Sequence, residues 1–87
     1  MKFNKFYDDN FNIIGSKLKV YREKTKISQD TLSNKLALLG ITLYQSDIYK
    51  IENNQRTVRD FELWGICYVL DIKAEDLFQP NTENEDK

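Results

Sequence analysis

The stretch that decides the fold is SQDTLSNKLALLGITLYQSDIYKIE, residues 28–52. Its first half carries leucines at the i, i+4 and i+7 positions of a helix, with the capping residue Ser28 before them and Gly40 after them. Glycine suits the left-handed residue just past a helix C-terminus. We therefore expect a helix between Ser28 and Gly40, followed by a turn into a second helix.

The second half of the stretch, residues 42–53, combines a buried and a free helix face. Ile48 and Ile51 are spaced for burial on one side. The other side holds Gln45, Ser46, Tyr49 and Lys50. Such side chains suit the edges of bases in a major groove, which is about as wide as one α-helix. A solvated helix flank has the same composition, so the pattern alone leaves both interpretations open.

Capping residues predict the ends of this helix. We expect it to begin near Tyr44, with Thr42 as an upstream cap. It should stop at Asn53 and Asn54, because asparagine is the residue other than glycine that best tolerates a positive φ.

An earlier helix should run to about Lys24. Its buried stripe is predicted to be Ile14, Leu18 and Tyr21. The candidate capping residues are Asp8, Asp9 and Asn10. Gly15 lowers the helix propensity, which close packing of a neighbouring backbone would explain.

Two further helical segments are expected after the central stretch. One runs from about Arg59 to Leu70, with Thr57 and Asp60 matching a capping box. Its core stripe is Leu63, Ile66, Cys67 and Leu70. A last helical turn is expected at residues 74–78.

The composition fits one small domain of 87 residues, 40% hydrophobic and 31% charged. We divide it into an N-terminal arm at residues 1–12, a helical domain at 13–78 and an acidic, disordered tail at 79–87. The sequence has no apolar run long enough to cross a bilayer, and its first residues lack the features of a signal peptide. We expect a cytoplasmic protein with no membrane contact.

The residue types argue against catalysis. One cysteine and no histidine remove the usual zinc ligand sets and the common nucleophile pairs. The acidic residues are scattered rather than clustered in an apolar pocket pattern. We expect neither an enzyme nor a metal or cofactor, and we interpret Cys67 as packing rather than as a redox switch.

The net charge of −1 hides an uneven distribution. Residues 13–60 hold nine Lys or Arg against five Asp or Glu, whereas residues 71–87 hold two against six. A modest basic region can follow a phosphate backbone if its cations share one face and the acidic end points away.

Four linked blocks carry a family resemblance: IGSKLKVYRE, ISQDTLSNKL, DIYKIENNQR and VRDFELWGICYVLDIKAEDLF. Over residues 13–78, about three quarters of the chain, it resembles the repressor/Cro-type helix-turn-helix family, also called the xenobiotic-response-element family. The resemblance implies an all-α, five-helix lambda-repressor-like bundle. It places the third helix in the major groove, usually in a homodimer on a two-fold operator. The chain departs from the commoner family pattern at four positions. Tyr44 and Lys73 stand where a capping residue is usual, and Asn54 and Asp71 stand where glycine is usual.

The resemblance also implies roles for individual residues. Base reading is implied for Gln45, Ser46, Tyr49 and Lys50. A Gln amide can pair with adenine N6 and N7, and a Lys can donate to guanine. Phosphate contacts are implied for Gln29, Asn54, Arg56 and Arg59. Asp47 would be repelled by phosphate unless it pairs with a cation or faces cytosine N4.

Arg22 and Glu52 are assigned a structural role in preference to a direct contact with DNA. In the family, an acidic residue at the end of the third helix pairs with a basic residue late in the first, and the spacing here allows the same. Truncating one partner should harm folding, because the other charge is left buried and unpaired.

A second apolar stripe lies on the predicted fourth helix at Phe61, Trp64 and Tyr68. A surface helix needs only one such stripe. Either the N-terminal arm covers it with Phe3, Phe6 and Tyr7, or it meets a second subunit or a protein partner. Aromatic residues are enriched at the centres of interfaces.

These features favour a sequence-specific regulator that binds double-stranded DNA as a homodimer, most simply a repressor that occludes a promoter. The alternative is a protein-binding module that keeps the same bundle, antitoxin-like or a polymerase-associated adaptor. Its working surface would be the aromatic stripe and the acidic end.

Overall fold

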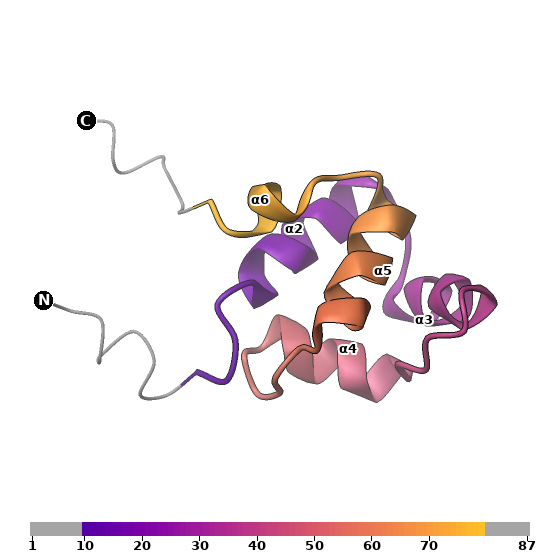
Figure 1. Cartoon of the computed structure of the whole chain (residues 1–87), viewed down its shortest axis with the longest axis horizontal. Coiled ribbons are helices and arrows are strands. Elements are labelled where there is room, and N and C mark those ends of the chain that lie inside the picture. Colours follow the sequence, from indigo (N-terminus) through magenta and orange to yellow (C-terminus); the bar gives the residue numbers. More distant parts are fainter. Residues whose placement is uncertain (1–9, 80–87) are drawn as a thin grey trace, which may run out of the picture.

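A computed structural model describes residues 10–79, which form five α-helices and no strand (Figure 1). The helices are α2 (Gly15–Lys24), α3 (Gln29–Leu38), α4 (Gln45–Glu52), α5 (Asp60–Leu70) and α6 (Ala74–Leu77). α4 packs against α2 and α3, and α5 packs against α3 and α6. The all-α class predicted from the helical spacing is confirmed.

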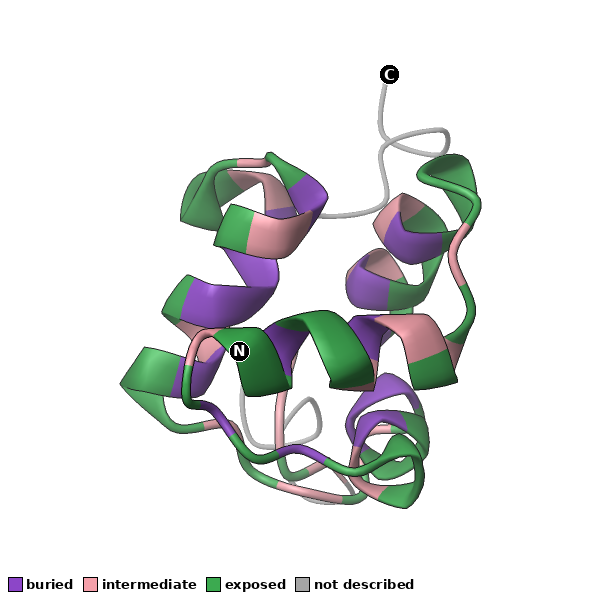
Figure 2. Cartoon of the chain, turned by 90° about the vertical axis from the view of Figure 1, so that its right-hand side faces the viewer, coloured by how far each residue is buried: buried purple, intermediate pink, exposed green. Residues whose placement is uncertain are grey.

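One apolar core joins the helices. Figure 2 shows the buried residues on the helix faces that turn inward and the exposed residues on the outer faces. The fully buried side chains are Leu18, Leu32, Leu36, Leu43, Ile48, Ile51, Ile66 and Leu77. Burying one such side chain contributes about 1.5–3 kcal/mol, so these positions supply most of the attraction between the helices.

Carboxylates three residues into the helix complete the N-termini of α4, α5 and α6. The residues before these helices, Tyr44, Arg59 and Lys73, make no capping bond through their side chains. Their backbone N–H groups instead donate to Asp47, Glu62 and Asp76, each at 2.9 Å. The predicted caps Thr42 and Thr57 are therefore wrong, because each lies two residues before the residue that flanks its helix. Ser28 does cap α3 as predicted, accepting the Thr31 N–H at 3.0 Å.

α2 begins later than the sequence indicated. Its first helical residue is Gly15, so Asn10 lies outside the helix, and Asp8 and Asp9 lie outside the described residues. The Asn12 side chain fills the capping role instead: its Oδ1 accepts the N–H groups of Ile14 and Gly15 at 3.0 and 2.9 Å. The prediction failed because Asn12 is held in place by the far end of α4, which no local pattern reveals.

Gly15 sits where another backbone approaches closely, as its position inside a helix suggested. A Cβ at Gly15 would collide with the carbonyl oxygen of Ile51 and would lie 2.9 Å from that of Glu52. Only glycine lets the start of α2 rest on the end of α4. The two helices meet here without an intervening side chain.

Left-handed residues follow four of the described helices. Lys26, Gly40, Asn54 and Asp71 have φ values of +64°, +81°, +63° and +57° after α2, α3, α4 and α5. After α3, the N–H groups of Gly40 and Ile41 return to carbonyls of the last turn, and buried Ile41 anchors the turn. Asn54 and Asp71 take the conformation that glycine usually takes at these positions.

Candidate nucleic-acid interface

α4 presents the polar face predicted for base reading. The helix lies along the lower side of the molecule in Figure 1, on the side opposite α6. Ile48 and Ile51 are fully buried beneath it. All four predicted base-reading residues are exposed on its free side: Gln45, Ser46, Tyr49 and Lys50. The buried and free faces thus divide as the spacing predicted.

Asp47 serves the start of α4 and also meets a cation. Its carboxylate accepts the Tyr44 N–H at 2.9 Å, and Oδ1 lies 3.7 Å from Arg56 Nε. An acidic side chain in the first turn also suits the positive end of a helix dipole. The pairing with a cation, one of the two conditions set for Asp47, is met within the chain.

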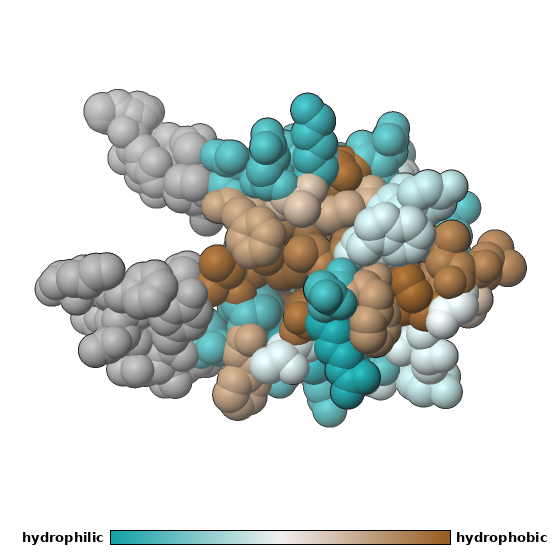
Figure 3. Space-filling model, viewed as in Figure 1, coloured by the Kyte–Doolittle hydropathy of each residue, from teal (hydrophilic) through white to brown (hydrophobic). Residues whose placement is uncertain are grey.

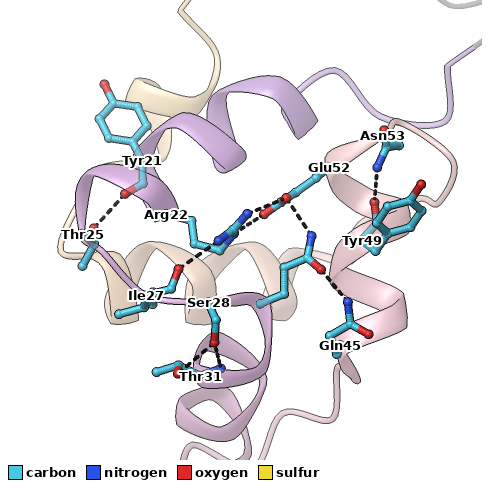
Figure 4. Close-up of polar contacts among 11 residues, drawn as sticks. Tyr21, Arg22, Thr25, Ile27, Ser28, Thr31, Gln45, Tyr49, Glu52 and Asn53 are labelled. Carbon is cyan, nitrogen blue, oxygen red and sulfur yellow. Dashed lines mark hydrogen bonds and ion pairs between the residues drawn. The ribbon is translucent and has the colours of Figure 1, made fainter.

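The predicted ion pair between Arg22 and Glu52 is present (Figure 4). Arg22 Nε and Nη2 donate to the two carboxylate oxygens at 2.6 and 3.1 Å, and Nη1 donates to the Ile27 carbonyl at 2.9 Å. The hydrogen bond with Glu52 raises the pKa of Arg22 above its usual value. The pair ties α2 to the end of α4, which accounts for its structural role.

Gln29 links this buried pair to the free face of α4. Its Nε2 donates to Glu52 Oε1 at 2.9 Å, and its Oε1 accepts from Gln45 Nε2 at 2.5 Å. Gln29 is half-buried as the first residue of α3. The phosphate contact that the resemblance implies for Gln29 stays a prediction, whereas its bonds inside the chain give it a positioning role.

In the connector between α4 and α5, two of the other residues predicted to contact phosphate form hydrogen bonds within the chain. Asn54 Nδ2 donates to the carbonyl oxygen and to Oδ1 of Asn12, at 3.0 and 3.1 Å. Arg56 donates to both oxygens of Glu62 at 3.0 and 3.2 Å. Arg59, by contrast, is exposed. Arg59 is therefore the more exposed of the two arginines, and the phosphate contacts implied for all three residues stay predictions.

Glu62 is a buried carboxylate that sequence reasoning did not single out. Burial by itself raises its pKa, but hydrogen bonds from Arg56 and from the Arg59 N–H outweigh this effect and hold the pKa below the usual value. The Glu62 bond in turn raises the pKa of Arg56. A carboxylate at the third position of the helix was the available signal for Glu62. Asn12 is of a capping residue type, but the bonds that place it reach Ile51 and Arg56 and leave no local signal.

The aromatic stripe on α5 is exposed in the described part of the chain. Phe61, Trp64 and Tyr68 have 49%, 57% and 65% of their surface exposed, and the rings of Trp64 and Tyr68 stack with centroids 5.4 Å apart. The proposed cover from Phe3, Phe6 and Tyr7 lies outside the described residues.

Two shallow grooves flank Tyr68. One, of about 400 Å³, runs beside Trp64 and over Cys67; the other, of about 280 Å³, runs toward Leu38. Figure 3 shows hydrophobic side chains across the middle of this face and at the end of α3. Leu38 is 86% exposed. The apolar surface therefore extends beyond α5 itself.

Cys67 lies on the buried side of α5, as the core stripe predicted. Burial raises the pKa of its thiol, with a smaller contribution from Asp76 in the same direction. A raised pKa keeps the thiol protonated and therefore unreactive. Residues 10–79 contain no group of three or more side chains that could hold a metal ion.

Comparison of the chain with family models, curated proteins and solved structures gave no match. None of the helices in the described range is long and apolar enough to cross a membrane.

Proposed function

We propose that this chain is a sequence-specific DNA-binding regulator in which α3 and α4 form a helix-turn-helix. The observation that carries the proposal is the division of α4: its buried side fixes the helix to the bundle, and its free side holds four exposed polar residues of the kinds that contact base edges. The resemblance of the sequence to the repressor/Cro-type family points to the same function. The protein acts most simply as a cytoplasmic repressor that occludes a promoter.

The proposed interface divides into base-reading and phosphate-binding residues. Gln45 and Lys50 supply hydrogen bonds to purine edges, and Tyr49 supplies a ring for a thymine methyl or a sugar. Arg59 follows the backbone beside them. Arg56, held by two carboxylates, acts mainly on the connector that sets the position of Arg59.

Selection of bound sequences from random duplex DNA tests the proposal. The unmodified protein should enrich one short motif, and Lys50→Ala and Gln45→Ala should each change the motif with a loss of about 1–3 kcal/mol per base contact. Far-UV helicity should stay unchanged in both variants, because the two side chains are exposed. If neither substitution alters the preferred sequence, α4 is not the reading helix.

A salt titration of the selected duplex separates phosphate contacts from base contacts. Arg59→Ala should weaken binding to all sequences alike. It should also lower the slope of log affinity against log salt concentration by about one unit, because one phosphate fewer is neutralised and fewer counterions are released on binding. Lys73→Ala, at the start of α6 on the opposite side of the bundle, is the matched control and should leave the slope unchanged. Equal slopes for Arg59→Ala and the unmodified protein would remove Arg59 from the interface.

We further propose that the protein works as a homodimer joined through the aromatic stripe of α5. One recognition helix reaches only a few base pairs, so selectivity among genomic sites calls for two copies about one helical turn apart. The second candidate function, a protein-binding module, is favoured by the same exposed stripe and its grooves. Failure to enrich any duplex, together with an α5 surface that captures a different protein, would support that alternative.

A further inference from the structure

We propose that Asn12 and Asn54 form a clamp that holds the connector between α4 and α5, residues 53–59, in the path that phosphate binding requires. The inference rests on the proposed function, because it explains how two side chains bonded inside the chain support the contact with DNA. It assigns both asparagines as positioning residues, neither of which touches the duplex.

The Asn12 amide ties the start of α2 to α4 and to the connector. Its Nδ2 donates to the carbonyl of Ile51 in α4 and to that of Arg56 in the connector, at 3.0 and 2.8 Å. Its Oδ1 accepts the N–H groups of Ile14 and Gly15. An asparagine amide has two N–H groups, so both are used on α4 and the connector while the oxygen caps α2.

Asn54 completes the clamp from the connector side. Its Nδ2 donates to the carbonyl oxygen and to Oδ1 of Asn12 at 3.0 and 3.1 Å, and its own carbonyl accepts the Phe11 N–H at 2.9 Å. The backbone of Asn54 is left-handed, with a φ of +63°, which glycine adopts at lower cost. Glycine has no side chain to reach Asn12, so the bonds to Asn12 are what asparagine adds at this position.

The connector is thereby held from two sides. It lies in no helix, and it joins the reading helix α4 to the exposed Arg59. The Arg56 side chain fastens it to Glu62 on α5, and the clamp fastens the carbonyl of the same arginine to the start of α2. A segment that is already ordered loses less conformational entropy when it binds. Loosening the clamp should therefore weaken binding to every sequence without removing a charge.

The first test removes the clamp and keeps the cap of α2. Asn12→Ser leaves an oxygen that can accept the Gly15 N–H, but it has no amide for the carbonyls of α4 and the connector. The affinity for the selected duplex should fall about three- to tenfold. The preferred sequence and the slope against salt concentration should stay the same, because no phosphate contact is lost. Asn34→Ser, the same substitution at an exposed position of α3, is the matched control and should leave the affinity unchanged. An unchanged affinity in Asn12→Ser would overturn the inference.

The second test separates the clamp from a direct phosphate contact of Asn54. Asn54→Gly keeps the left-handed backbone and removes only the side chain. If the two asparagines act as a unit, Asn54→Gly should lower the affinity about as much as Asn12→Ser does, and the double variant should lose little more. Fold-losses that multiply in the double variant would show that Asn54 acts on DNA independently of Asn12, which contradicts the clamp.

A measurement without DNA separates this inference from the proposed function. In ¹⁵N relaxation of the free protein, Asn12→Ser and Asn54→Gly should both raise the picosecond-to-nanosecond mobility of the Arg56 and Thr57 amides, and Asn34→Ser should not. If no duplex is enriched but these amides become mobile, the clamp stands as a structural feature, and the DNA-binding function fails together with the role given to the clamp. If a duplex is enriched and the amides stay rigid in both variants, the function stands and the clamp fails.

Discussion

Arg22 and Glu52 form an ion pair that is almost closed to solvent, with 10% and 1% of the two side chains exposed. Two charges cost several kcal/mol each to remove from water, and their mutual attraction offsets that cost only when both are present with good geometry. The paired bonds at 2.6 and 3.1 Å supply such geometry. Removing one partner therefore does more damage than removing both.

The first prediction follows from this asymmetry. Arg22→Ala and Glu52→Ala should each lower the free energy of unfolding by about 3–5 kcal/mol, because an uncompensated charge is left inside. The double variant should lose clearly less than the sum of the two. Urea denaturation of all four proteins measures the coupling, and additive losses would mean that the pair does not contribute as a unit.

Gly15 carries the second prediction. Gly15→Ala should destabilise the protein by about 1–3 kcal/mol, although alanine has the higher helix propensity, because the new Cβ collides with the Ile51 carbonyl. Ser16→Ala, one residue along on an exposed position of the same helix, is the control and should have a neutral or slightly stabilising effect. A rise in melting temperature for Gly15→Ala would show that α2 and α4 do not pack this closely.

At the level of elements, the connector is held by the bidentate contact between Arg56 and Glu62 at the start of α5. Because folding lowers the pKa of Glu62, the stabilisation is fully present above the ordinary carboxyl value of 4.5 and is lost as the pH falls through the lowered pKa. The third prediction concerns the fall in melting temperature between pH 6 and acidic pH. This fall should be larger for the unmodified protein than for Glu62→Gln. Parallel curves for the two proteins would contradict it.

The helices themselves could be predicted from the sequence because apolar spacing is a local signal. Ser28, Gly40 and Asn54 could also be placed, since caps and left-handed residues depend on the residue type at one position. The starts of α4 and α5 were predicted to within one residue, but their caps were misjudged, because the chain uses a carboxylate at the third position of the helix in place of a capping hydroxyl before it.

The site was predictable only where it depends on helix faces. The exposure of the α4 residues follows from a period of 3.6, as does the burial of Ile48 and Ile51. The bond between Gln29 and Gln45 joins residues 16 apart, and the ties of Asn12 span up to 44 residues. Such contacts depend on how two helices pack, which one sequence does not specify.

For the molecule as a whole, the exposed aromatic stripe of α5 is the contact we propose for a homodimer. The fourth prediction is a homodimer in sedimentation equilibrium that Trp64→Ala weakens and Tyr68→Glu abolishes, because the stacked rings lie at the centre of the proposed contact. Val20→Glu, a half-exposed apolar position on α2, is the control and should leave association unchanged. A concentration-independent monomer for the unmodified protein would defeat the dimer, and a dimer indifferent to both substitutions would place the contact elsewhere.

The bonds of the Asn12 side chain should slow hydrogen exchange at the start of α2. The first amides of a helix usually exchange with solvent within the fraying time of the helix end. Here the amides of Ile14 and Gly15 are bound to Asn12 Oδ1, while Asn12 Nδ2 is bound to the carbonyls of Ile51 and Arg56. We therefore expect that freeing those two protons also disturbs the contact of Asn12 with the end of α4 and the connector after it. In D₂O, the fifth prediction is that both exchange as slowly as the buried middle of α2, and that Asn12→Ala speeds their exchange to that of a frayed end while Leu18 stays slow.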